Sequence, residues 1–495
     1  MNYLELLKLA APETIIVIVA LVALVIDLTT LRELETRMRF VIAGMIACVG
    51  CAAAILWMLV TPEHADAFAG MLVVNPTTQF VKICILVLTI FTVLVSLESS
   101  FTTHVGEYLA LILLATSGMM FLVSAQDILV IFIALELISL SLYVLAAFNK
   151  RDIKSAEAAV KYFLFGGMSA AFMLFGLSLI YGLSGSTNLS QIADALKGKG
   201  LDPLLVVAIV MTVIGFGFKV AAVPFHLWAP DAYQGAPTPS AAFIASGSKV
   251  ASFFILAQVM MLGFNGAEGN AAYHNYAAGW VPVIAVVAGC SIVLGNLVAI
   301  VQSSVKRLLA YSAIAHAGYM LLAVASHDDE AVASLIYYAV TYGLTTIGAF
   351  GVVAVVEAQS GDDKLTSFAG LSRRAPVVSM CMMVFMLSLA GIPPLAGFFG
   401  KFYVFTAAIQ YGAPDLGLLW LVILAIAMSA VSLYYYLQVL KQIYVAEPTK
   451  MAGNGPSVLT QVVLGLLALL VTLLGIAPNL ILKTLLAAIH PGGHE

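Results

Sequence analysis

Long apolar runs separated by short polar stretches dominate the hydrophobic pattern of this chain. A helix needs about 20 largely apolar residues to cross the hydrocarbon core of a bilayer, and fourteen segments meet that requirement. They lie near residues 11–31, 40–60, 75–97, 106–124, 127–149, 157–182, 203–230, 237–263, 280–301, 306–325, 331–357, 376–411, 415–440 and 457–486. The pattern therefore predicts an all-α polytopic membrane protein with about 14 transmembrane helices.

Two of these segments, 203–230 and 376–411, are too long for one straight span and contain internal prolines. Pro224 interrupts the first, and Pro393 and Pro394 interrupt the second. A helix break at membrane depth is tolerated only where protein or a water-filled cavity satisfies the freed backbone groups. We therefore expect two broken helices next to a hydrated interior.

Broken helices occupy the fourth place in two blocks of five spans, residues 106–263 and 280–440. Because five is odd, the second block begins on the opposite side of the membrane from the first. This is the inverted repeat in which transporters place a site at the midplane. The flanking domains would be residues 1–105, with transmembrane helices 1–3, and residues 441–495, with a loop and helix 14.

The distribution of lysine and arginine predicts the orientation of these spans, since cytoplasmic loops are enriched in both. When the connections are numbered alternately, thirteen of the 22 basic residues fall in the odd ones, and four fall in the even ones and the termini. The odd connections are thus expected to face the cytoplasm. Both termini would face the opposite, periplasmic side.

Composition supports the same class and excludes others. The 495 residues are 62% hydrophobic and only 10% charged, whereas a soluble domain carries about 25% charged residues. The net charge of −4 does not indicate a nucleic-acid partner. Cys48 and Cys51 have the spacing of a redox motif but lie in an apolar span without the further ligands of a cluster, so we interpret them as packing residues.

Four ionisable residues lie deep within predicted spans: Glu136, Lys219, Lys249 and Lys401. A lysine at the bilayer centre costs about 2.5–3.5 kcal/mol on insertion scales, so such residues are candidates for function. Lys249 lies about twelve residues, or roughly 18 Å, from either end of its span, which is too far for its side chain to reach an interface. Desolvation favours the neutral form of a lysine, which allows it to release and accept a proton.

Glu136 admits two interpretations, a structural ion pair that fixes helix register or a carboxylate in a proton relay. Lys219 is its expected partner because both lie at mid-depth in the first block. Lys401 follows the second break and is the counterpart of Lys219 in the second block.

Other polar residues in the spans are weaker candidates. Lys161 and Lys82 lie one and two turns inside their spans, so both could extend to the interface. His316 is either a structural or a relay histidine, and His226, beside the first break, is a gate or a packing residue. No metal-ligand spacing, complete dinucleotide motif or nucleotide-binding loop occurs in the sequence. We expect no redox cofactor in this chain.

Three segments carry a family likeness: Lys219–Pro239 followed by Lys249, Lys306–Tyr319, and Ser388–Lys401. They resemble the antiporter-like membrane subunits of respiratory complex I. Within that family two features favour the N branch over M and L. The second broken helix carries lysine where M is expected to have glutamate, and the chain ends soon after its last span, without the long lateral helix of L.

The resemblance implies a proton-translocating subunit of the membrane arm of a bacterial NADH:quinone oxidoreductase in the inner membrane. It implies that Glu136, Lys219, Lys249 and Lys401 form a hydrated mid-membrane axis, with Lys161 and His316 as further relay residues. FMN, iron–sulfur clusters and quinone would belong to partner subunits. Subunits K and M would be the neighbours within the membrane, together with lipids.

Two rival hypotheses share this fold. One is a subunit of a multi-subunit Na⁺(K⁺)/H⁺ antiporter without any redox partner. The other is a structural subunit that bridges its neighbours and does not pump.

Overall fold

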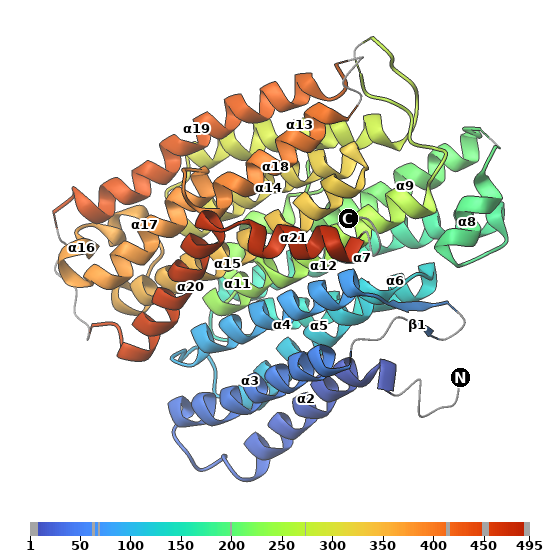
Figure 1. Cartoon of the computed structure of the whole chain (residues 1–495). Coiled ribbons are helices and arrows are strands. Elements are labelled where there is room, and N and C mark those ends of the chain that lie inside the picture. Colours follow the sequence, from blue (N-terminus) through green and yellow to red (C-terminus); the bar gives the residue numbers. More distant parts are fainter. Residues whose placement is uncertain are drawn as a thin grey trace. The chain divides into compact units, whose positions relative to one another are not determined.

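The computed structural model describes residues 8–61, 65–67, 70–198, 200–272, 274–411, 416–447 and 455–489. Within these ranges, 13 helices are long and apolar enough to cross a membrane. The predicted span 376–411 is divided into two helices, α17 (Pro376–Ala390), which is a shorter apolar helix, and α18 (Ala396–Gln410). The expected all-α polytopic class is confirmed (Figure 1), with one small addition: a two-stranded antiparallel hairpin of β1 (Ala65–Ala67) and β2 (Leu72–Val74).

The chain forms two compact units. The first contains the described residues up to Gly215, Gly235–Gly266 and the end of the chain from Ala487. Its elements are α2 (Ala11–Thr29), α3 (Thr36–Val60), the hairpin, α4 (Pro76–Ser96), α5 (Val105–Ser124), α6 (Ile128–Ala146), α7 (Ile153–Ser184), α8 (Leu189–Leu196), most of α9 (Pro203–Val220), α11 (Thr238–Ala245), α12 (Gly247–Gln258) and a π-helical turn, Val259–Gly263.

The second unit contains Phe216–Gln234 and Ala267–Leu486. Its elements are α10 (Trp228–Gly235), α13 (Trp280–Ile300), α14 (Val305–Ser326), α15 (Asp329–Ser360), a 3₁₀ turn (Leu365–Phe368), α16 (Leu371–Arg374), α17 (Pro376–Ala390), α18 (Ala396–Gln410), α19 (Leu419–Tyr444), α20 (Val458–Ile476) and most of α21 (Asn479–Ile489). Residues 412–415, 448–454 and 490–495, which fall in the predicted second block and C-terminal segment, lie outside the described residues.

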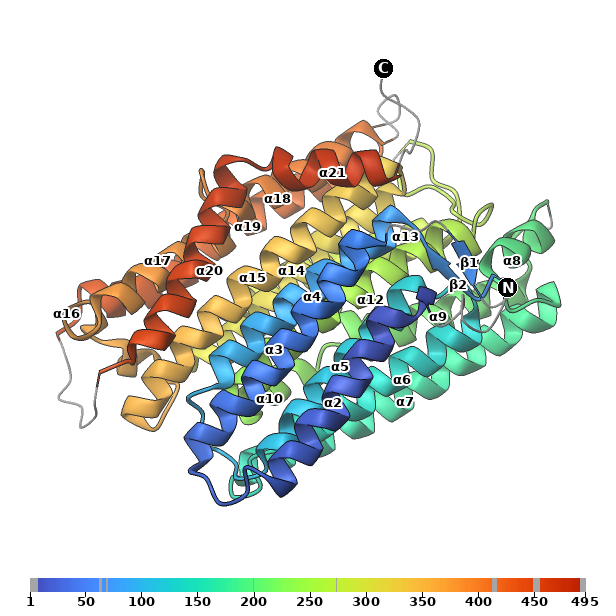
Figure 2. The same ribbon diagram turned by 60° about the horizontal axis from the view of Figure 1, so that its bottom comes forward.

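In the first unit α2, α3, α4 and α5 run side by side (Figure 2). Small residues allow this close packing: a methyl group on Gly50 of α3 would lie 2.5 Å from Val19 of α2. In the second unit α13 packs along α14, and α15 packs against both α17 and α18. Helices α14 and α15 are almost entirely buried within the protein.

Helix boundaries differ from the sequence prediction at three places. Helix α9 ends at Val220, where Ala221 takes a left-handed conformation with φ 59°, so the first break begins three residues before Pro224. Lys219 therefore lies in the last turn of α9 and not at the middle of a span.

The predicted span 237–263 is not one continuous helix. Ser246, with φ −118° and ψ −86°, interrupts it between α11 and α12. No proline marks this break, but Gly247 follows Ser246 directly, and Gly/Ser pairs are common at helix kinks. Ser246 also donates its hydroxyl to the Ala242 carbonyl at 2.7 Å, a local side-chain bond that competes with the helical ladder. Likewise, the predicted last span 457–486 ends at Ile476, and α21 leaves α20 at an angle in both views (Figures 1 and 2).

Candidate functional site

Lys401 lies at the second helix break and is held by backbone atoms that the break sets free. Helix α17 ends at Ala390, and Gly391 leaves it with φ 86°. The last carbonyls of a helix have no partner within it and carry its negative dipole end. Lys401 Nζ donates to two of them, Leu389 O at 3.0 Å and Ala390 O at 3.0 Å, and to Ser429 Oγ at 2.8 Å. The three donors of this ammonium are thus satisfied inside the protein, where the residue is only 5% exposed.

Glycines make this arrangement possible. A methyl group on Gly397 of α18 would lie 1.9 Å from the Ser388 carbonyl oxygen, and one on Gly391 would lie 3.1 Å from Lys401 Cδ. Both halves of the broken helix therefore approach each other closely enough for Lys401 to reach back to α17.

His316 of α14 lies in a buried network of hydroxyl groups in the same unit. Its Nδ1 lies 2.7 Å from the Tyr338 hydroxyl and its Nε2 lies 3.1 Å from the Tyr436 hydroxyl. Tyr436 in turn bonds Ser312 Oγ at 2.5 Å. A neutral imidazole has one donor and one acceptor nitrogen. Here each nitrogen lies within hydrogen-bond distance of a tyrosine hydroxyl, which can either donate or accept a hydrogen bond.

Tyr319 connects the histidine network with the lysine. Lys401 Nζ lies 5.2 Å from the centroid of its ring, and the His316 ring contacts the same side chain edge-on with centroids 5.7 Å apart. The Tyr319 hydroxyl accepts a hydrogen bond from Asn296 at 3.0 Å. The structure thus brings two residues predicted from the sequence, His316 and Lys401, close to the same tyrosine ring.

Lys219 lies at the first break, next to Phe218, with its Nζ 5.7 Å from that ring. The freed carbonyl of Phe218 accepts a hydrogen bond from Trp228 Nε1 at 3.0 Å, and Val223 N donates to Ser291 Oγ at 2.9 Å. Side chains therefore stabilise this break as Lys401 stabilises the second one. His226 is buried within the break, 7% exposed.

Lys249 belongs to the first unit and is 2% exposed. It follows the interruption at Ser246 by three residues, and its backbone N–H bonds the Ser246 carbonyl at 3.1 Å. The sequence placed this lysine on an uninterrupted span, whereas it lies at a third irregular point in the membrane.

Glu136 and Lys161 also belong to the first unit. Glu136 lies on α6 with its Oε1 atom buried. Lys161 is on α7 and pairs with Glu157 one turn earlier at 2.6 Å, where both side chains are partly exposed. The expected partnership of Glu136 with Lys219 joins residues of different units and stays a prediction.

Sequence reasoning missed several members of these sites. The only sequence signal for these residues is a polar group within an apolar span. They are Tyr338, Tyr436, Asn296 and Ser429. Lys82, which by its position in the sequence could extend to the interface, is instead buried and forms an ion pair with Glu13 at 2.6 Å. Among the described residues, no three His, Cys, Asp or Glu side chains stand close enough to hold a metal ion.

Known proteins resemble this chain along almost its whole length. It is 52% identical over 495 residues to NADH-quinone oxidoreductase subunit N 2 of Acidobacterium capsulatum, covering 98% of this chain and 99% of that one. It is 42% identical to NADH-quinone oxidoreductase subunit N of Desulforamulus reducens, covering 77% of this chain and 78% of the relative.

Solved structures agree in fold. A chain of respiratory complex I from Thermus thermophilus with bound aureothin superimposes with a TM-score of 0.79 at 34% identity, over 97% of this chain and 100% of that one. A chain of the Mrp complex from Dietzia has a TM-score of 0.82 over 97% of each chain, but at 19% identity it shows a shared fold alone.

A family model described as the transmembrane region of NADH:quinone oxidoreductase and Mrp antiporters matches residues 125–432. This region contains both helix breaks and the candidate residues Glu136, Lys249 and Lys401. The match agrees with the resemblance inferred from the sequence motifs. The chain belongs to the NADH:quinone oxidoreductase/Mrp antiporter transmembrane family, and within it to the branch of the N subunits.

Proposed function

We propose that this chain is the proton-translocating subunit N of the membrane arm of an NADH:quinone oxidoreductase, complex I. It would couple electron transfer from NADH to quinone, carried out by partner subunits, to the movement of protons. The near full-length identity to subunits N supports this assignment. The observation that carries the translocation role is the buried Lys401 ammonium, bonded at a helix break beside the His316 network.

The contacts of Lys401 suggest how it would handle a proton. In the charged state its three N–H groups bond Leu389, Ala390 and Ser429. If one proton leaves, the amine keeps two donors and gains a lone pair, and one of the three acceptors must find water or another donor. Burial favours the neutral amine, whereas the three hydrogen-bond acceptors favour the charged ammonium, and such opposed effects suit a site that loads and unloads a proton.

Tyr319 and the His316 network would supply the next positions for that proton. His316 can accept a proton on one nitrogen while the other nitrogen releases one to the tyrosine oxygen that it bonds, provided that this hydroxyl passes its own proton onward, as Tyr436 can to Ser312. Such an exchange moves a proton across the ring without leaving a net charge in the membrane.

The full relay would run through Glu136, Lys219, Lys249 and Lys401, with Lys161 and His316 as secondary members and His226 as a gate. We infer that residues 106–263 and 280–440 are inverted repeats that each supply one broken helix. The N-terminal helices, residues 1–105, and the C-terminal segment, residues 441–495, would flank them.

Partners and location follow from the same proposal. Subunits K and M would be the neighbours in the membrane, and FMN, iron–sulfur clusters and quinone would lie in other subunits. The chain would sit in a bacterial inner membrane with both termini on the periplasmic side.

The test replaces Lys401 by methionine in the assembled complex and measures NADH-driven proton pumping in membrane vesicles. Methionine keeps the unbranched shape but leaves the Leu389 and Ala390 carbonyls without their donor. We expect pumping to fall at least tenfold, about 1.4 kcal/mol in a barrier, while the chain still inserts. Lys441→Met, at an exposed position in the last turn of α19, is the matched control.

Glu136→Ala and Lys219→Ala are expected to lower pumping in the same way. Unchanged pumping by assembled Lys401→Met and Lys219→Ala complexes would refute the relay. Purification of the chain with its native partners tests the complex itself: copurifying flavin and iron–sulfur subunits support it. A cofactor-free assembly with sodium-dependent proton flux would point to a cation/proton antiporter instead.

A further inference from the structure

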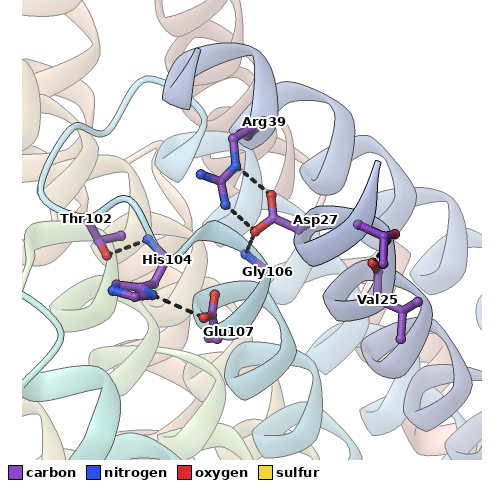
Figure 3. A network of polar contacts seen from close by, with 8 residues as sticks. Val25, Asp27, Arg39, Thr102, His104, Gly106 and Glu107 are labelled. Atoms are coloured by element: carbon purple, nitrogen blue, oxygen red, sulfur yellow. Dashed lines mark hydrogen bonds and ion pairs between the residues drawn. The ribbon is translucent and has the colours of Figure 1, made fainter. Parts of the chain in front are cut away.

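Two buried ion pairs in the first unit differ in how completely their polar atoms are satisfied. Asp27 binds Arg39 through both oxygens, at 2.8 and 2.6 Å, and also accepts the Gly106 backbone N–H at 2.8 Å (Figure 3). This pair ties α2 to α3 and to the start of α5. Because both carboxylate oxygens have partners, the pair is explained by its structural role.

Glu13 and Lys82 form the second pair and leave polar atoms unsatisfied. Glu13 Oε1 lies 2.6 Å from Lys82 Nζ, and both side chains are only 3% exposed. The other carboxylate oxygen, Glu13 Oε2, is buried and has no hydrogen-bond partner among the described residues, and Ser124 Oγ of α5 is in the same state. An unsatisfied buried oxygen is costly, and this cost is higher for a carboxylate.

A small cavity is lined by the residues that carry these unsatisfied atoms, and a larger cavity shares Lys82 with it. The small one, of about 10 Å³, is lined by Glu13, Lys82 and Ser124, and a space of this size holds about one water molecule. The larger one, of about 150 Å³, is lined by Lys8, Trp57, Thr61, Gln79 and Lys82. Lys82 lines both, and Lys8, which lines the larger one, is exposed.

The polar lining indicates what fills these cavities. An apolar cavity of about 150 Å³ stays dry, whereas one with two or more polar partners takes up water. A metal cation is disfavoured because the Lys82 ammonium already occupies Glu13, and an anion is disfavoured by the carboxylate. Water can hydrogen-bond to both the Glu13 carboxylate and the Lys82 ammonium, and a proton can bind to the carboxylate.

We propose that Glu13 and Lys82 form a hydrated ionisable site that exchanges protons with the aqueous phase at the end of the unit that carries the β1–β2 hairpin. A proton passes from a hydronium ion in the cavity to Glu13 Oε2, leaving a water molecule. The reverse step returns the proton to water, and Lys82 keeps its own proton throughout. The titratable groups that line the two cavities are Lys8, Glu13 and Lys82.

This site is separate from the proposed relay and lies outside the matched family region, residues 125–432. Helix α4, which carries Lys82, packs against α12, which carries Lys249. The proposal concerns water access and proton exchange, so it does not depend on whether the chain pumps protons.

Water access is tested with Ag⁺, a thiol-reactive ion close to water in size. Ser124→Cys is compared with Thr116→Cys in assembled complexes whose five native cysteines are replaced by alanine. Thr116 lies about two turns before Ser124 in α5, is fully buried and bonds Thr89 at 3.0 Å, away from the cavities. We expect Cys at 124 to react at least tenfold faster than Cys at 116, and equal rates would overturn the proposal.

Proton exchange is tested by infrared difference spectroscopy on the complex with all native cysteines in place. We expect a carboxyl band whose intensity follows the bulk pH and which is lost in Glu13→Gln. The absence of any Glu13-dependent band would overturn the proposal even if the cysteine variants fail to assemble.

Discussion

Gly397→Ala tests whether the close approach of α17 and α18 holds Lys401 in place. The added methyl group would lie 1.9 Å from Ser388 O, a backbone atom that cannot rotate away. Ordinary contact begins near 3.4 Å, so the two half-helices must separate by about 1.5 Å. The Lys401 bonds to Leu389 and Ala390, each 3.0 Å long, would then stretch to about 4.5 Å and be lost.

The expected loss of stability in Gly397→Ala follows from the two broken hydrogen bonds. A hydrogen bond to a charged group contributes about 1.5–3 kcal/mol, so two of them amount to roughly 3–6 kcal/mol if water does not replace them. Overpacking alone costs about 1–3 kcal/mol. A loss of stability above about 3 kcal/mol exceeds what overpacking alone explains and would therefore indicate that the lysine contacts are broken.

The assay is the thermal denaturation midpoint of the detergent-solubilised complex, together with NADH-driven proton pumping. Gly465→Ala is the matched control, because Gly465 lies in helix α20 with no atom within 4 Å of its added methyl group. That change should stabilise the helix by about 0.5–1 kcal/mol. If Gly397→Ala behaves like Gly465→Ala in both measurements, the inference that the break positions Lys401 is wrong.

Two further predictions concern other polar contacts. His316→Gln keeps one donor and one acceptor for the two tyrosine hydroxyls but cannot exchange protons between two nitrogens, so we expect normal assembly and at least tenfold weaker pumping, measured in vesicles. Asp27→Asn breaks a buried bidentate pair and leaves the Arg39 guanidinium without its counter-charge, a loss of about 3–5 kcal/mol. Assembled complex should decrease strongly on native gels, whereas Arg37→Gln, which removes an exposed pair, should change it little.

Much of the fold and part of the candidate site could be predicted from the sequence. Runs of apolar residues determine membrane spans because a bilayer offers no partner for exposed backbone groups. Prolines within overlong apolar segments indicated both helix breaks. The positions of Lys249 and Lys401 within apolar segments indicated that these lysines would be buried, as they are in the structure.

Contacts between distant segments could not be predicted in this way. The partners of His316 are 22 and 120 residues away from it, and Glu13 is 69 positions before Lys82. Which way a polar side chain points within an apolar span depends on the rotation and neighbours of its helix. For that reason the sequence does not distinguish a Lys82 that extends to the interface from one that pairs with Glu13 inside the protein.

The sequence by itself determined the membrane class, the family motifs and the positions of isolated charges within apolar segments, since these depend only on local hydrophobicity and spacing. The tertiary structure alone decided which carbonyls receive the Lys401 ammonium, which tyrosines flank His316 and which ion pair is left half satisfied. Hydrogen bonds require atoms within about 3 Å, and only the packing of helices brings residues so far apart in the chain to that distance.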